Sequence, residues 1–296
     1  MRSSILSLLA ASLTICTTTV TGLGFTATFE KDGQELDPSK LELVKTPPTR
    51  HWHRQWKNRH SNSTAGGLTS RRDSLGKPGK EDISYSDNWC GAAHRTTPSD
   101  PVQNIFAYFT VPDLKLRPNI PPPQFAAAWV GIDGAKCNWT MLQAGVTTVV
   151  NSNGGQSASA WWEWFPEATY TIKGLPVKPG DWMSVNITAK DETHARVIVT
   201  NMQRGYAMTV ELAGGPKLCR EDTEWIVEDF YEAETNKQVA FASFSDVWFL
   251  DAAATTVKGK NVGIDGSALV HLKNPKGEVL CKSEKYDNSN FVVSSY

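Results

Sequence analysis

Beyond its first 22 residues the chain has no apolar run long enough to cross a bilayer, so we expect no membrane span there. It contains no Gly-x-Ser-x-Gly motif, which argues against a nucleophile elbow. Its six histidines show no metal-ligand spacing and no glycine-rich phosphate loop precedes a helix, so we expect no metal and no cofactor. Carboxylates and aromatic side chains therefore remain as the groups able to carry chemistry.

The first 22 residues have the pattern of a secretory signal peptide. Arg2 supplies the positive end, residues 5–16 are mostly apolar, and small residues follow. The apolar stretch is too short to span a membrane, and a buried N-terminal helix is the alternative interpretation. The pattern predicts a secreted, extracellular protein.

Cysteine is scarce, and secretion makes its few positions informative. Cys16 leaves with the signal, and an even number remains: Cys90, Cys137, Cys219 and Cys281. In an oxidising compartment this predicts two disulfides, for which sequence alone allows three connectivities. N-glycosylation acceptor triplets are also present, beginning at Asn62, Asn138 and Asn186.

Positive charge is concentrated in residues 23–80. These carry 11 Lys/Arg against 6 Asp/Glu, whereas residues 81–296 carry 18 against 25, so a leader of +5 precedes a body of −7. The leader has little hydrophobic periodicity and a His/Arg/Trp-rich run at 50–60, so we expect it to be largely disordered. We interpret it as a propeptide, with Arg71-Arg72 as a processing site, that lies over an anionic cleft. A nucleic-acid-binding arm is the alternative, which secretion disfavours.

The body, residues 81–296, reads as one all-β unit. Short runs rich in Val, Ile, Thr and aromatics recur, separated by Gly, Pro, Asn and Asp, which favours an antiparallel sandwich or barrel. The predicted strands span 105–111, 125–132, 158–165, 183–189, 196–201, 206–212, 225–230, 239–244, 247–250, 268–272, 279–282 and 291–293.

Three clusters combine aromatic residues with acids or an amide. They are WVGIDG at 129–134, followed by Gln143 at the end of an apolar run before a small-residue turn; AWWEWFP at 160–166; and EWIVEDF at 224–230. Strand alternation in the third puts Glu224 and Glu228 on one face, about 13 Å apart. A glutamate among apolar residues has a raised pKa, which makes it a usable acid or base.

Each cluster has a plain structural alternative: a solvated glutamate, core tryptophans, or a satisfied glutamine at a strand end. Together, and in this order, the clusters resemble the glutamic peptidases, or eqolisins, from about Asn88 to the C-terminus. The resemblance implies a lectin-like (concanavalin A-like) β-sandwich of two curved antiparallel sheets, with the substrate groove on the concave face. The signal, basic propeptide and acidic body fit a secreted zymogen whose propeptide is an intramolecular inhibitor.

The resemblance also implies a catalytic pair, Gln143 and Glu228, with Glu224 as the rival for the glutamate. Groove residues that match the family are Trp89, Trp129, Asp133, Trp161 and Glu163. Cys137 and Cys219 match a family bridge, and we interpret Cys90 and Cys281 as an extra one.

The function implied is that of an acid endopeptidase that acts on polypeptides, needs no metal and is insensitive to pepstatin. The sequence does not reveal the oligomeric state, and a secreted monomer is the simplest expectation. The glutamate would activate a water, and the glutamine would stabilise the oxyanion. A glycoside hydrolase of the same sandwich class is the runner-up, with Glu163 and Glu228 as paired carboxylates and neighbouring tryptophans as sugar platforms. A non-catalytic lectin or adhesion domain is the third interpretation.

Overall fold

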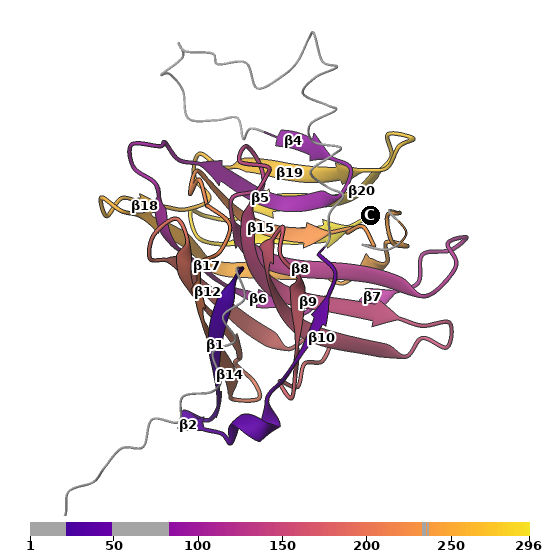
Figure 1. The fold of residues 1–296 in the computed structure, drawn as a ribbon. Helices are drawn as coiled ribbons and strands as arrows, with labels where there is room; N and C mark the ends of the chain where they lie inside the picture. The colour runs from indigo at the N-terminus through magenta and orange to yellow at the C-terminus, as the bar shows by residue number, and fades with distance from the viewer. Residues whose placement is uncertain (1–21, 49–82, 233–234, 236) are drawn as a thin grey trace, which may run out of the picture.

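The structure is a computed structural model that describes residues 22–48, 83–232, 235 and 237–296 (Figure 1). It is a β-sandwich, with no α-helix among these residues. The first sheet, from edge to edge, contains β3 (Glu42–Thr46), β11 (Thr169–Lys173), β10 (Gln156–Phe165), β9 (Met141–Val150), β8 (Gln124–Ile132), β15 (Asp222–Glu228), β5 (Trp89–Arg95) and β19 (Ala268–Lys273), with β4 (Ile83–Ser86) parallel to β19.

The second sheet contains β21 (Phe291–Ser295), β17 (Val247–Thr256), β6 (Val102–Thr110), β12 (Trp182–Ala189), β13 (His194–Asn201), β14 (Tyr206–Ala213) and β1 (Gly24–Lys31). β20 (Val279–Lys285) pairs with both β19 and β21 and so connects the two sheets along one side. The remaining short elements are β2 (Gln34–Glu35), the 3-10 turn η1 (Pro38–Lys40), β7 (Leu114–Lys115), β16 (Ser243–Phe244) and β18 (Asn261–Val262).

Apolar side chains cover both faces of the first sheet. Trp225 and Val227 of β15 point into the main core between the sheets. Ile226, which alternates with them, joins a smaller cluster on the opposite face with Trp129 and Trp161. This double burial explains why β15 is buried at every position, and it places the predicted site face away from the main core.

All the predicted strands overlap observed ones, although the segment 239–244 contributes only the two residues of β16. The strand β9 was not predicted, and it corrects the environment expected for Gln143. Gln143 is the third residue of this ten-residue strand and is not followed by a turn. The strand continues because Gly145 leaves room: a Cβ there would lie 2.2 Å from the Ala128 carbonyl oxygen and 2.5 Å from the Trp129 Cβ.

The expectation of a largely disordered leader does not hold for residues 24–46. β1 pairs with β14 along all eight of its residues, and β3 pairs with β11 along all five. The segment has no core of its own, but it shares the core of the body: Phe29 is 2% exposed. The predicted signal peptide, Asn62 and the dibasic pair lie outside the described residues.

Both predicted disulfides are present. Cys90 on β5 is bonded to Cys281 on β20, and Cys137 is bonded to Cys219 just before β15. Of the described glycosylation triplets, Asn138 is partly exposed, whereas Asn186 lies within β12 and its side-chain oxygen accepts a hydrogen bond from Asn104. In the described part of the chain, no helix is long and apolar enough to cross a membrane.

Candidate active site

Three neighbouring strands, β9, β8 and β15, bring the sequence-predicted residues onto one face. Gly131 of β8 lies opposite Gln143 on one side and Glu224 on the other. Glu228 lies four residues further along β15, opposite Ala127. The predicted alternation of β15 is therefore confirmed, and Gln143 shares the face of both glutamates.

Glu228 is a buried carboxylate held by three nitrogen donors. Its Oε2 accepts from the Trp129 indole at 2.8 Å, and its Oε1 accepts from the Trp89 indole at 3.2 Å and from the Asn88 amide at 3.1 Å. Burial raises the pKa of Glu228 from 4.5 to about 7, while the three donors oppose the rise because they favour the ionised form. The group is thus poised to take up and release a proton.

Asn88 is a site residue that sequence reasoning missed. The Ser86 hydroxyl donates to the Asn88 side-chain oxygen at 3.0 Å, which turns the amide nitrogen toward Glu228. The same hydroxyl accepts from the backbone N–H groups of Asn88 and Trp89. Asn88 lies just before a strand and so belongs to no alternating pattern that could mark it as a site residue. Its position next to Trp89 was the one feature of the sequence that could have indicated it.

Gln143 is buried and is tied to the neighbouring strand β10. Its amide nitrogen donates to Glu163 Oε2 at 3.3 Å, and the Thr169 hydroxyl donates to the same oxygen at 3.0 Å. The Gln143 side-chain oxygen is buried without a hydrogen-bond partner among the described residues. Glu163 therefore fixes the amide orientation, and the second amide hydrogen is available to another acceptor.

Trp129 borders both candidate catalytic residues. Its indole N–H binds Glu228, while a Cβ built on Gly131 would lie 3.0 Å from its ring and 3.4 Å from the Gln143 Cβ. Trp89 packs edge-to-face against Trp129, with ring centroids 5.3 Å apart. Trp161 donates from its indole to the Thr147 hydroxyl at 2.9 Å. Trp89 and Trp129 thus lie beside Glu228, and Trp161 belongs to the same apolar cluster.

Glu224 has a different setting. It is fully buried, and neither of its oxygens has a hydrogen-bond partner of normal geometry among the described residues. Burial first, and the charges of Asp222 and Asp133 second, hold its pKa well above the usual value, while the nearby Ala135 N–H only partly opposes them. The balance of these contributions favours the protonated form, whereas a general base must be ionised.

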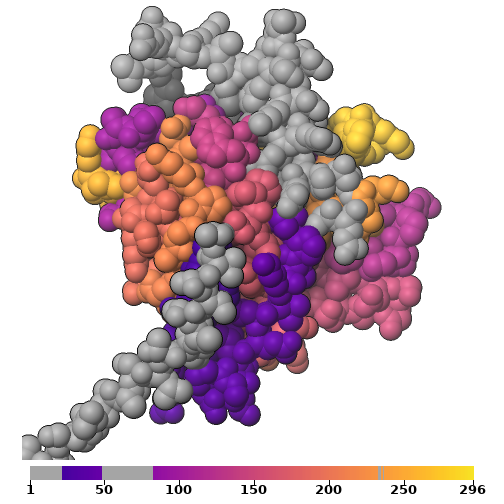
Figure 2. Space-filling view, viewed as in Figure 1, coloured from indigo at the N-terminus to yellow at the C-terminus, as the bar shows by residue number. Residues whose placement is uncertain are grey.

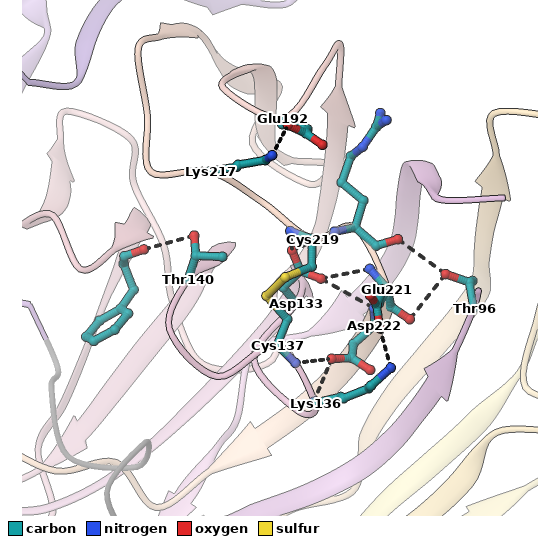
Figure 3. Close-up of a disulfide and its surroundings, with 12 residues drawn as sticks. Thr96, Asp133, Lys136, Cys137, Thr140, Glu192, Lys217, Cys219, Glu221 and Asp222 are labelled. Atoms are coloured by element: carbon teal, nitrogen blue, oxygen red, sulfur yellow. Dashed lines mark hydrogen bonds and ion pairs between the residues drawn. A yellow bond between two sulfur atoms is a disulfide. The ribbon is translucent and has the colours of Figure 1, made fainter. Parts of the chain in front are cut away.

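The Asp133 carboxylate is used to bind backbone N–H groups (Figure 3). Its oxygens accept from the N–H groups of Cys219 and Arg220, both at 2.8 Å, and of Glu221 at 2.9 Å, and burial raises its pKa to about 7. In the opposite direction, the Asp222 carboxylate accepts a hydrogen bond from the backbone N–H of Cys137 at 3.0 Å. Asp133, predicted as a groove residue, thus fixes the loops that carry the disulfide.

The same corner holds a candidate metal-ligand cluster. Ligand atoms of Asp133, Cys137 and Cys219 lie within 4.8 Å of one another. Both sulfurs are joined in the disulfide, and a metal ligand would have to be a thiolate. This cluster therefore does not fit a metal.

Comparisons with known proteins identify the family of the chain. Residues 87–296 match the Peptidase A4 family. The chain is 30% identical to aspergillopepsin-2 of Aspergillus niger over 242 residues, which cover 76% of this chain and 83% of that protein. It is 32% identical to scytalidopepsin B of Scytalidium lignicola over 152 residues, which cover 49% of this chain and 56% of that protein.

Solved structures show the same sandwich. Scytalido-glutamic peptidase, solved with a peptide-based transition-state analogue, matches with a TM-score of 0.63 and 25% identity, covering 71% of this chain and 99% of that one. Aspergilloglutamic peptidase from Aspergillus niger matches with a TM-score of 0.54 and 31% identity, covering 58% and 99%. The predicted fold class is confirmed, and a family match that spans more than half of the chain shows that this protein belongs to the Peptidase A4 family, the glutamic peptidases or eqolisins.

Proposed function

We propose that this peptidase is a secreted acid endopeptidase that hydrolyses peptide bonds with Glu228 and Gln143. The observation that carries the proposal is the setting of Glu228: a buried carboxylate with three nitrogen donors, on the sheet face that also bears Gln143. The scytalido-glutamic peptidase structures, solved with peptide-based inhibitors, support a polypeptide substrate.

In the proposed reaction, ionised Glu228 removes a proton from a bound water as the water oxygen attacks the scissile carbonyl carbon. Negative charge develops on the carbonyl oxygen, to which the free amide hydrogen of Gln143 donates. A preorganised donor of this kind is typically worth about 3–4 kcal/mol in the transition state. Glu228 then gives its proton to the leaving nitrogen, and the peptide C–N bond breaks. The step needs no covalent intermediate.

The acid range follows from hydration of Glu228. The pKa of about 7 belongs to the buried carboxyl, and desolvation is its largest cause. When water fills the groove, desolvation weakens while the three donors remain, and every remaining cause lowers the pKa. The base is then ionised in acid, and Gln143 donates without titrating.

We also propose that the chain is made as a zymogen and acts as a monomer. The charge asymmetry supports the zymogen: residues 49–80 of the leader, which carry +7, can pair with carboxylates of the body, which carries −7. As these carboxylates protonate in acid, the attraction weakens, so release is coupled to pH. A leader that stays equally inhibitory in acid and at neutral pH, measured on the unprocessed chain, would contradict this coupling.

No observation favours the glycoside hydrolase. Glu163 accepts from Gln143 and from Thr169, and Gln143 is its cross-strand neighbour on the side toward β8. The amide therefore stands between the two carboxylates that such an enzyme would need to pair across a glycosidic bond.

The test is a proteolysis assay of the processed protein on a denatured protein substrate, from acid to neutral pH, with pepstatin and a metal chelator present. Gln143→Ala, Glu228→Gln and Glu224→Gln run beside the wild type. We expect activity in acid that resists both inhibitors and is lost with the first two changes only. Retained activity in Glu228→Gln, with loss in Glu224→Gln, would transfer the role to Glu224.

A further inference from the structure

Residues 24–46, which we call the edge segment, add one strand to the outer edge of each sheet. β1 lies beside β14 of the second sheet (Figure 1), and β3 pairs with β11 of the first. The short β2 and η1 lie between them in the chain. In Figure 2 the indigo surface of this segment covers the lower part of the face in view. The segment thus closes the same side of both sheets.

Apolar contacts seat the edge segment. Phe29 is 2% exposed, belongs to the main core and stacks near Tyr206, with ring centroids 5.7 Å apart. Phe25 makes edge-to-face contacts with Trp162 at 5.2 Å and with Tyr170 at 5.0 Å. The body leaves these aromatic surfaces at its edges, and the segment covers them.

The positive charge of the leader plays little part in this contact. Residues 24–46 carry three lysines and five acidic residues, a balance of −2, whereas residues 49–80 carry the excess, +7. Backbone hydrogen bonds and aromatic packing do not titrate between acid and neutral pH. The edge segment is therefore held by interactions that differ from those proposed for the basic part.

Few titratable groups face the edge segment from the body. Lys31 contacts the Tyr206 ring and the Arg204 carbonyl oxygen, and both contacts persist in acid. Glu211 lies opposite Thr26 but pairs with body cations, Lys190 and Arg196. On the other edge, Glu42 lies opposite Lys173 and Lys45 lies opposite Tyr170. Glu167 of the body also lines one hollow with Lys45. Protonation in acid therefore weakens only surface attractions, of Glu42 to Lys173 and of Glu167 to Lys45, each worth little.

The edge segment is also connected to the candidate site. The Thr46 hydroxyl donates to the Thr169 carbonyl oxygen at 3.3 Å, and the Thr169 hydroxyl donates to Glu163, the partner of Gln143. β3 therefore supports the edge strand that orients the predicted oxyanion donor. Losing β3 would free β11 on one side and loosen this chain of contacts.

We propose that the edge segment is a permanent part of the processed protein: after the chain is cut between residues 49 and 82, residues 24–46 stay bound as a separate, noncovalently held chain. The segment remains bound both at neutral pH and in acid. The body surface formed by the edges of β11 and β14 is thus an interaction surface whose partner is this segment. This inference does not depend on the catalytic roles of Glu228 and Gln143.

The experiment uses the full chain with a sequence-specific protease site replacing residues 62–67, in the Glu228→Gln background to limit self-digestion. After cleavage, gel filtration and mass spectrometry of the main peak are run at neutral pH and in acid. We expect both pieces in one peak, in equal amounts, under both conditions. Separation of the leader piece under either condition would overturn the proposal.

Two variants of the cleaved protein sharpen the result. Phe29→Ala should speed loss of the leader piece by about 100-fold or more, because it removes a buried aromatic side chain. Thr28→Ala is the matched control, since Thr28 is exposed on the same strand and its loss should leave retention unchanged. If Phe29→Ala does not fold, Phe25→Ala takes its place with a smaller expected increase. If the tested phenylalanine variant keeps the leader piece as long as the wild type does, the proposal that aromatic packing holds the edge segment would be overturned.

Discussion

Two buried glutamates lie on one face of β15, four residues apart, and they differ in what surrounds their carboxyl groups. Glu228 accepts from Trp129, Trp89 and Asn88. At Glu224 burial and neighbouring acids dominate, and the Ala135 N–H and the Arg95 charge oppose them only in part. Burial raises the pKa of both. A raised pKa therefore does not by itself distinguish the two glutamates; the side-chain donors around Glu228 do.

The difference follows from which part of β15 each residue occupies. Glu224 lies at the end of the strand near Asp222 and Asp133, whose carboxylates hold loops around the Cys137–Cys219 disulfide. Glu228 lies at the other end, opposite Trp89 of β5. One end of the strand thus uses acids for structure, and the other surrounds an acid with groups that stabilise its charge.

The largest expected effect is on activity when the favoured glutamate is neutralised. Glu228→Gln should lower kcat/KM by about 10⁴-fold, since the same group is proposed as both base and acid. Glu224→Gln is the matched control and should change kcat/KM little in acid. Steady-state kinetics on a peptide substrate decide the matter; equal losses in the two variants would remove the distinction between the two ends of β15.

Removing the side-chain amide of Gln143 should lower activity less than neutralising Glu228 does. We expect Gln143→Ala to lower kcat by about 10²–10³-fold with a small change in KM, because the proposed hydrogen bond forms to the developing oxyanion. Glu163→Gln changes the residue that orients the Gln143 amide, not the amide itself, and should lower kcat less. A rise in KM with kcat unchanged would instead assign Gln143 to substrate binding.

The structural acids should make the fold less stable as the pH rises. The folded chain keeps protons on Glu224, on Asp133 (pKa about 7) and on Asp229, whose pKa burial also raises, while the unfolded chain loses them near pH 4. Stability is thus fully present below about pH 4 and is lost as the pH rises toward 7. Denaturant unfolding at several pH values measures this loss.

Glu224→Gln should remove part of that loss. A neutral amide has no proton to lose in the unfolded chain, so the stability of the variant relative to the wild type should rise between acid and neutral pH. The gain should be absent in acid, where both chains are neutral at this position. A stability difference that does not change with pH would mean that Glu224 is already ionised in the folded protein.

The strand β15, which carries Glu224 and Glu228, also shows what could be predicted from the sequence. The alternation of β15 follows from its residue pattern, because Trp225 and Val227 fill one core while Ile226 and the glutamates face the other way. The Cys137–Cys219 pairing is implied by the family resemblance, Cys90–Cys281 is interpreted as an extra bridge, and both are present. The local residue pattern predicts a strand and its two faces correctly where the side chains of that strand fill the core.

Prediction failed where a partner far along the chain supplies the context. β1 alternates Phe25 and Phe29 with polar residues, yet it is stable only because β14 and the main core receive them. The small residues after Gln143 predict a turn, whereas Gly145 is small because Trp129 packs against it. Asn88 acts through Ser86 and Glu228, 140 residues away, and no local pattern reports such a contact.

The smallest expected effect tests that contact. Asn88 donates to the ionised form of Glu228 and so lowers its pKa; Asn88→Ala should move the acid limb of the kcat/KM profile up by about one pH unit. Ser86→Ala should shift it less in the same direction, because the amide loses only the contact that orients it. A structural role alone would lower activity without moving the limb. The profile therefore separates a residue that tunes Glu228 from one that merely packs beside it, and an unmoved limb in Asn88→Ala would leave the two indoles as the donors that matter.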